Sequence, residues 1–242
     1  MPEYRERIYR NSIKVKDLVS FNVSVKETDL SISAERDLKR EAEDIVLNIR
    51  YKIENYISMN PEFMSSLDPV PDDPFAPPII KDMIENSRKA GVGPMASVAG
   101  AVAQYLGLEL LEYTGQIIIE NGGDIFLRVS RDVTVSIYAG ESPLSNRVGI
   151  IIPKKKMPLG VCSSSGRIGH SLSLGISDVT CILSPSALLA DSAATALGNR
   201  IHSKKDLQII HETAESIEGI TGGVAIVGDE MAVWGEVELT AI

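Results

Sequence analysis

Five segments with the character of β-strands follow one another along the chain, and they constrain the fold more than any other feature. They span residues 116–120, 124–129, 133–138, 147–152 and 179–183. Segments with the character of helices lie mainly before and after this group. A regular alternation of strands and helices would favour a doubly wound parallel sheet, whereas grouped strands favour an α+β fold. We therefore expect an α+β protein with mixed antiparallel sheets covered by helices.

The segments on either side complete this expectation. Residues 7–15 and 20–28 alternate between apolar and polar side chains, which predicts an antiparallel pair of strands. Apolar residues at helical spacing predict a helix over residues 35–57, with Ser33 as its N-cap. Residues 60–78 are rich in proline and predict an irregular surface connection. Further helices are expected over residues 78–90, 96–108, 185–199 and 204–216, and a closing pair of strands over residues 223–227 and 231–239.

Length and charge limit the classes of protein. With 242 residues, 44% of them hydrophobic and 24% charged, the chain has the composition of a well-cored protein, and we expect residues 1–242 to form one domain. The formal net charge of −9 argues against nucleic acid as a partner, because phosphate contacts need clustered Lys and Arg. Residues 91–111 include polar side chains and predict a buried helix rather than a membrane span, and the first residues lack the apolar core of a signal peptide. A cytoplasmic location without a membrane partner is expected.

Both cysteines lie in segments with strand character. Neither Cys162 nor Cys181 belongs to a C-x-x-C pair of the kind that binds zinc or acts in redox chemistry. We interpret both as buried thiols. A nucleophilic role for Cys162, beside a loop that carries a histidine, is the alternative.

The segment richest in candidate chemistry runs from Ser163 to Thr195. Asp191 and Thr195 are four residues apart on an expected helix, so their Cβ atoms lie about 6 Å apart on one face and their oxygens can converge. A carboxylate and a hydroxyl in this arrangement suit Mg2+, which takes few protein ligands and completes its shell with waters and phosphate oxygens. A Ser/Gly-rich strand end, residues 163–166, would supply hydroxyl and amide donors to a phosphate-bearing ligand.

Each candidate also has a structural interpretation. Asp191 on an alanine-rich helix can face solvent, and Thr195 can bond to its own backbone. Residues 121–124, with the sequence Asn-Gly-Gly-Asp, are typical of a hairpin turn. His170 is either a structural hydrogen-bonding group or an acid, base or phosphate contact, and the glycines on either side favour a turn that approaches a ligand. The motifs around these residues favour the functional interpretation.

Four motifs follow one another in the sequence. They are Gly93-Pro-Met-Ala-Ser97, Asn121-Gly-Gly-Asp124, Ser164-Ser-Gly166 with His170 downstream, and Ala190-Asp-Ser-Ala-Ala-Thr195-Ala-Leu197. In order and approximate spacing they resemble motifs of the ApbE superfamily, the flavin transferases that move FMN from FAD onto a threonine of a partner protein using Mg2+. The chain is most similar to a cytosolic, uncharacterised family of ApbE-like proteins, uncharacterised protein family 0280.

The resemblance implies an ApbE-like fold and a role for each motif. The main-chain carbonyl near Ala96 and the side chains of Asp191 and Thr195 would hold the metal, Mg2+. His170 would face the phosphates as the catalytic residue. The pocket for FAD or a related flavin nucleotide would be lined by Asn121, Gly122, Gly123, Asp124, Ser163, Ser164, Ser165 and Gly166.

The sequence also departs from the family pattern. Ser97 stands where the family has a lysine, and Ser-Leu-Ser-Leu follows His170 in place of Ile-Ile-Asp-Pro. Loss of the lysine removes a charge that would neutralise developing phosphate charge. Three functions therefore stay open: a Mg2+-dependent FMN transferase or FAD pyrophosphate hydrolase, a non-catalytic binder of a flavin or other nucleotide, and a scaffold that has lost the site. The alanine-rich helix and the closing hairpin would permit a homodimer, and no motif identifies an acceptor protein.

Overall fold

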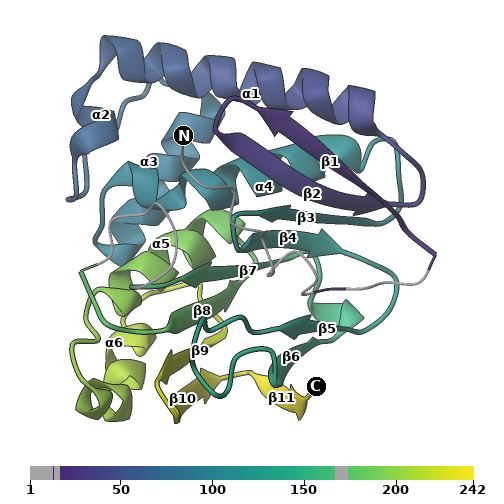
Figure 1. Ribbon diagram of the computed structural model, residues 1–242. Coiled ribbons are helices and arrows are strands. Elements are labelled where there is room, and N and C mark those ends of the chain that lie inside the picture. The colour runs from purple at the N-terminus through teal and green to yellow at the C-terminus, as the bar shows by residue number, and fades with distance from the viewer. Residues whose placement is uncertain (1–12, 14–16, 167–173) are drawn as a thin grey trace.

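An eight-stranded antiparallel sheet lies at the centre of the computed structural model, which describes residues 13, 17–166 and 174–242 (Figure 1). Its strands are, in spatial order, β1 (Val19–Val25), β2 (Thr28–Ala34), β3 (Ile117–Asn121), β4 (Asp124–Arg128), β7 (Leu159–Ser164), β8 (Val179–Ser184), β9 (Gly222–Val227) and β10 (Glu230–Gly235). A second, three-stranded sheet has the order β11 (Glu238–Ala241), β6 (Val148–Ile152) and β5 (Val133–Ser136). The expected α+β class is confirmed.

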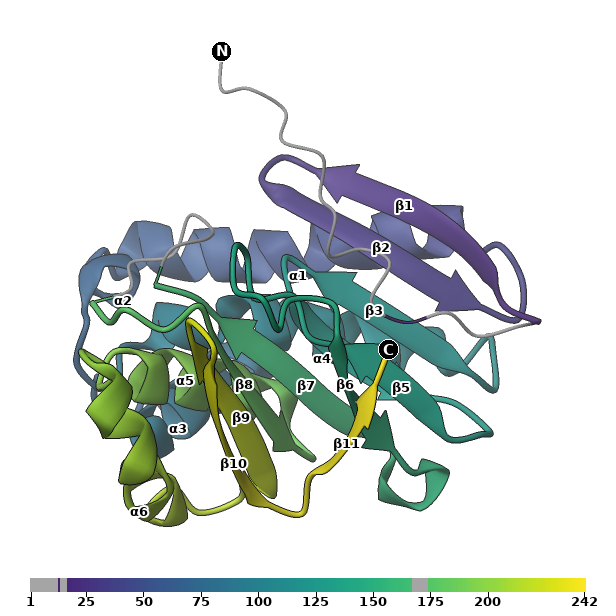
Figure 2. The ribbon, with the colours of Figure 1, turned by 60° about the horizontal axis from the view of Figure 1, so that its bottom comes forward.

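The helices cover one face of the large sheet, and the small sheet covers the other (Figure 2). The longest helix, α1, runs beside β1 and β2. The α-helices are α1 (Lys39–Met59), α2 (Glu62–Ser65), α3 (Pro78–Ala90), α4 (Val98–Leu110), α5 (Ala187–Gly198) and α6 (Ile210–Glu215). Short 3-10 helices are η2 (Pro94–Ser97), η3 (Lys154–Lys156) and η4 (Lys204–Gln208). None of the described helices combines the length and apolar character that crossing a bilayer requires.

Each face of the large sheet contributes to a separate hydrophobic core. Because successive side chains of a strand point to opposite faces, Ile119 of β3 packs toward the helices while its neighbour Ile118 packs toward the small sheet. The same alternation places Cys162 on the helix side and Val161 on the other side. Strands with two buried faces read as nearly continuous apolar runs, as β8 does.

The first hairpin differs from the sequence expectation. β1 pairs with β2, a strand that the sequence analysis did not predict. The strand predicted over residues 7–15 lies outside the described residues except for residue 13. Ser33 belongs to β2 and is not a helix cap. Helix α1 begins at Lys39, and its N-cap Leu38 makes no side-chain hydrogen bond to the first turn. The apolar Leu30 and Ile32 alternate with polar neighbours, which is the pattern of a strand with one buried face.

Two elements expected to be continuous are divided. Residues 204–216 form η4 followed by α6. Residues 231–239 contribute to both β10 and β11, which lie in different sheets. Gly235, the last residue of β10, has a φ of 68°, a left-handed conformation that glycine adopts without steric cost.

Candidate functional site

A cavity of about 350 Å³ lies where the β3–β4 turn, the end of β7, η2 with the start of α4, α5 and β5 meet. Most of the residues that the sequence singled out line this one cavity. These are Ala96, Asn121, Gly122, Gly123, Asp124, Ser163, Ser164, Ser165, Asp191 and Thr195. Segments far apart in the chain are thus brought together as expected.

The Asn-Gly-Gly-Asp segment is a two-residue hairpin turn that also forms a wall of the cavity. Asn121 pairs with Asp124 at the end of the β3–β4 ladder, and Gly122 and Gly123 have φ values of 69° and 109°. Glu120 Oε1 accepts a hydrogen bond from Gly123 N–H at 2.8 Å. Asn121 Nδ2 donates to the Ala99 carbonyl at 3.1 Å, which ties the turn to the start of α4. The hairpin interpretation is confirmed, and it is compatible with a place in the site.

Helix α5 presents Asp191 to the first turn of α4. Asp191 Oδ2 accepts a hydrogen bond from Gly100 N–H at 2.9 Å. N–H groups in the first turn of a helix have no partner within that helix, so this carboxylate satisfies one of them. The expectation that Asp191 might only face solvent is wrong, because the side chain is half-buried and bonded.

Two carboxyl groups share the buried end of the cavity. Burial, and then the nearby Asp191 carboxylate, raise the pKa of Asp124 well above its usual range, and a hydrogen bond from the Ser163 amide opposes this shift. Burial likewise raises the pKa of Asp191 to about 7, while the amides of Gly100 and Ala99 lower it. Asp124 is only 6% exposed. Its Oδ1 atom has no hydrogen-bond partner among the described residues.

The donor set suits a hard cation. In the described part of the chain no group of three or more His, Cys, Asp or Glu side chains is arranged to hold a metal ion. Mg2+ needs no such group, because it binds through one or two carboxylates and keeps several waters or phosphate oxygens. The Asp191 carboxylate and the Thr195 hydroxyl line the cavity beside the unpartnered Asp124 Oδ1, so the residues present fit this cation.

Three other predicted positions do not line the cavity or lie outside the described residues. Gly166 is not a lining residue; a Cβ there would lie 2.2 Å from the Gly175 carbonyl oxygen, so this glycine permits close packing behind the strand end. His170 falls in residues 167–173, outside the described part. Ser97 is fully buried, donates to the Pro94 carbonyl at 2.7 Å and is not a lining residue, although Ala96 and Val98 beside it are. That Ser97 leaves the phosphate position short of one positive charge stays a prediction.

Sequence reasoning missed much of the cavity wall. β5 contributes Val135 and Ser136, and the two residues that follow this strand contribute Ile137 and Tyr138. No sequence signal links this strand to the site, because its position depends on packing between the two sheets. Glu120 was also missed, although it directly precedes the Asn-Gly-Gly-Asp turn.

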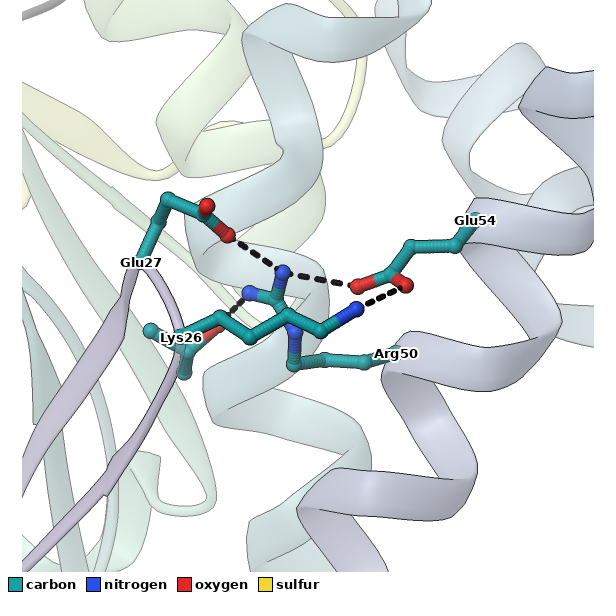
Figure 3. A network of polar contacts seen from close by, with 5 residues as sticks. Lys26, Glu27, Arg50 and Glu54 are labelled. Atoms are coloured by element: carbon teal, nitrogen blue, oxygen red, sulfur yellow. Dashed lines mark hydrogen bonds and ion pairs between the residues drawn. The ribbon is translucent and has the colours of Figure 1, made fainter.

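The β1–β2 turn contributes Glu27 to the cavity lining, and an ion-pair network holds this turn against α1 (Figure 3). Arg50 of α1 contacts Glu27 at 2.5 Å and Glu54 at 2.7 Å, and it donates to Thr28 Oγ1 at 2.6 Å. Lys26 contacts the other oxygen of Glu54. Helix α1 therefore helps to position one lining residue of the cavity.

The cysteines are buried and free, as expected. Burial raises the pKa of the Cys162 thiol well above its usual range and that of Cys181 to about 11. A thiolate is the nucleophilic form, so these pKa shifts argue against a nucleophilic role for Cys162. Cys181 lines the cavity as a neutral, weakly polar surface.

Comparison with known proteins agrees with the four motifs. A family model described as AbpE bacteria matches residues 10–221. A UPF0280 protein of Methanocella arvoryzae is 38% identical over 213 residues, covering 87% of this chain and 86% of that protein. A UPF0280 protein of Methanosarcina acetivorans is 33% identical over 241 residues, covering 98% of this chain and 94% of that protein.

Solved structures share the fold at low sequence identity. The apo form of the flavinyl transferase ApbE of Pseudomonas stutzeri has a TM-score of 0.54 at 13% identity, covering 92% of this chain and 94% of that chain. The ApbE protein of Thermotoga maritima has a TM-score of 0.55 at 11% identity, covering 89% and 96%. From its sequence relatives and its fold, the chain belongs to the UPF0280 family of ApbE-like proteins.

Proposed function

We propose that this protein binds a flavin nucleotide, with FAD as the first ligand to test, together with a divalent cation such as Mg2+ in the cavity described above. The observation that carries the proposal is the pairing of Asp124 and Asp191 at its buried end, with Asp124 Oδ1 left without a partner among the described residues. Two neighbouring carboxyl groups with raised pKa values resist ionisation, and a cation held by Asp191 beside Asp124 would offset that cost for both groups. The flavinyl transferase of Pseudomonas stutzeri, which shares the fold, suggests the ligand class.

The cavity has one acidic end and one apolar end. Val135, Ile137, Val161 and Val179 form apolar lining where the two sheets face each other. A planar ring system fits such a surface, because ligand sites are commonly apolar with a few placed polar groups. The acidic end carries Asp124 and Asp191, where the cation would bridge the protein to the phosphates.

We propose Mg2+-dependent cleavage of the FAD diphosphate as the reaction: a hydroxyl of a protein acceptor, or water, bonds to the phosphorus of the FMN half, the bond to the bridging oxygen breaks, and AMP leaves with that oxygen. Among the described residues, no Lys, Arg or His lines the cavity. The cation, when bound, would polarise a phosphoryl oxygen and offset phosphate charge. Asp191 and Thr195 would hold the cation, the Ala96 main chain would complete its protein ligands, and Ser163 to Ser165 would donate hydrogen bonds to the ligand.

Calorimetric titration of FAD with and without Mg2+ tests the proposal, and chromatography of the mixtures tests for FMN. We expect tight binding only with Mg2+, followed by release or transfer of FMN. Binding without FMN formation would replace the reaction with the non-catalytic alternative. No binding in either titration would leave only a scaffold and contradict the proposal.

Variants should be asparagines, because they keep the hydrogen-bonding shape and remove the charge. Asp191→Asn retains an acceptor for Gly100 N–H and should abolish the Mg2+ dependence of FAD binding. Asp124→Asn should weaken the Mg2+ dependence of FAD binding without abolishing it. Asp82→Asn is the matched control, because Asp82 is a half-buried carboxylate outside the cavity that accepts from Tyr105 OH at 2.6 Å. An unchanged Mg2+ dependence in Asp191→Asn would remove this residue from the site.

A further inference from the structure

Helices α4 and α5 each satisfy an N–H group in the first turn of the other. Gly100 N–H of α4 donates to Asp191 Oδ2 at 2.9 Å. Ala187 N–H, at the start of α5, donates to Gln104 Oε1 at 2.7 Å. Each acceptor lies four residues, about one turn, beyond the donor on its own helix. The two hydrogen bonds therefore form a reciprocal pair across one helix contact.

Close backbone packing leaves little freedom at this contact. A Cβ on Gly100 would lie 2.2 Å from the Ala187 carbonyl oxygen, and a Cβ on Gly160 of β7 would lie 2.4 Å from Ala187 Cα. Ala187 is fully buried between α4 and β7. The direction of α5 is thus fixed at its first residue, one turn before Asp191.

We infer that Gln104 is a positioning residue for the proposed cation site. Its side chain is not part of the cavity lining, so it acts through α5. The hydrogen bond from Ala187 N–H holds the first turn of α5 against α4, and this sets the direction from which the Asp191 carboxylate enters the cavity. The inference rests on the proposed function, because it concerns the geometry of the same cation site.

The Asp191 carboxylate both accepts a hydrogen bond and lines the cavity. Oδ2 accepts from Gly100 N–H, and the side chain is part of the cavity lining. Loss of the Gln104 acceptor leaves the buried Ala187 N–H without its partner, and a small shift of the first turn of α5 that recovers one carries Asp191 with it. A ligand oxygen that moves by a fraction of an ångström binds Mg2+ less well, because this cation demands near-ideal octahedral geometry. Groups that orient metal ligands typically contribute 10- to 100-fold to metal affinity.

The test is Mn2+ affinity without nucleotide, measured by electron paramagnetic resonance of the free ion on native protein, Gln104→Met and Tyr105→Phe. Methionine keeps the length of the side chain and removes the acceptor for Ala187 N–H. Tyr105→Phe is the matched control, because it removes a hydrogen bond from the neighbouring position of α4 to α3 and leaves the α4–α5 pair intact. We expect Mn2+ binding to weaken at least about 10-fold in Gln104→Met and to stay within about twofold in Tyr105→Phe.

Gln104→Glu keeps an acceptor in a side chain of nearly the same volume and should bind Mn2+ with native affinity. If only side-chain volume mattered, Gln104→Met would bind with native affinity as well. If Gln104→Met does not fold, Gln104→Asn withdraws the acceptor by one methylene and should give the same loss. Native affinity in Gln104→Met or Gln104→Asn, or equal losses in Gln104→Met and Tyr105→Phe, would overturn the inference while the proposed function stands. Absence of Mn2+ binding by the native protein, with Mg2+-independent FAD binding, would instead contradict the proposed function itself.

Discussion

At the scale of single residues, Asp191 combines an observed role with a proposed one, and the two need different properties. As the acceptor for Gly100 N–H it needs only an oxygen, whereas a cation ligand needs a negative charge. Burial raises its pKa to about 7, so near neutral pH the group is divided between the neutral and ionised forms. A bound cation selects the ionised form.

This shift predicts how stability depends on pH. The pKa of Asp191 in the folded protein lies above the ordinary value of 3.8, so between roughly pH 4 and 7 the folded state binds more protons at this group than the unfolded state does. Its contribution to the free energy of unfolding therefore falls as the pH rises through that window. Urea unfolding without divalent cations, compared between native protein and Asp191→Asn from pH 4 to 8, should show a larger loss in the native protein than in the variant, where only the raised pKa of Asp124 still contributes.

Added Mg2+ should reverse the loss, because the cation displaces the proton. We expect a larger Mg2+-induced gain in the free energy of unfolding at pH 8 than at pH 5. Equal gains at both values, or a gain that survives in Asp191→Asn, would show that the cation stabilises the protein elsewhere.

At the scale of elements, the β3–β4 turn needs glycine at residue 122 for its backbone conformation and not for lack of space. A Cβ on Gly122 would meet no atom within 4 Å, but its φ is 69°. The cost of substitution should therefore come from backbone conformation, about 1–2 kcal/mol for an ordinary side chain. We expect Gly122→Val to lower the free energy of unfolding by about this amount or more and Gly122→Asn to lower it less, because asparagine tolerates the left-handed region. Chemical denaturation measures both, and equal losses would point to a clash that the structure does not show.

The elements also show what the sequence could predict. The stripe of apolar residues in α1 and the glycine turn at residues 121–124 are local signals, and both were recognised. The segment of β2 carries an equally local signal, with Leu30 and Ile32 buried and their neighbours partly exposed, but no element was predicted between residues 28 and 35 apart from Ser33 as a helix N-cap. The contribution of β5 to the cavity was beyond reach, because Val135 lines it only through the packing of one sheet on another.

The helical spacing of Asp191 and Thr195 predicted that both face one cavity, whereas the electrostatics of that cavity were not foreseen. Asp124 was expected to line a flavin pocket, and the structure places its carboxyl group beside Asp191. Nothing in the sequence separates a turn carboxylate that faces solvent from one that is 6% exposed. Burial of this kind depends on contacts between distant segments.

At the scale of the whole molecule, one sheet is shared by two cores. The helix-side core and the core beneath the small sheet meet across β3, β4, β7, β8 and β9. Loss of packing in either core exposes one face of strands whose opposite face belongs to the other core. We therefore propose that residues 1–242 form one domain that unfolds as a unit.

The chain contains one tryptophan, Trp234 in β10, which makes this proposal simple to test. Tryptophan fluorescence reports the edge of the large sheet, while far-ultraviolet circular dichroism reports all helices and strands. We expect the two signals to change at the same guanidinium concentration, as they do when no intermediate is populated. Separate midpoints would divide the molecule into two cooperative units.

The double role of Asp191 also bears on how this site would change during evolution. A descendant that no longer needed the cation would still gain stability from an oxygen opposite Gly100 N–H, so selection for folding alone would disfavour alanine or leucine at this position. Asparagine would meet that need without the charge. Replacement of this aspartate by asparagine, rather than its disappearance, is therefore the mark that an inactive lineage would leave in its sequence.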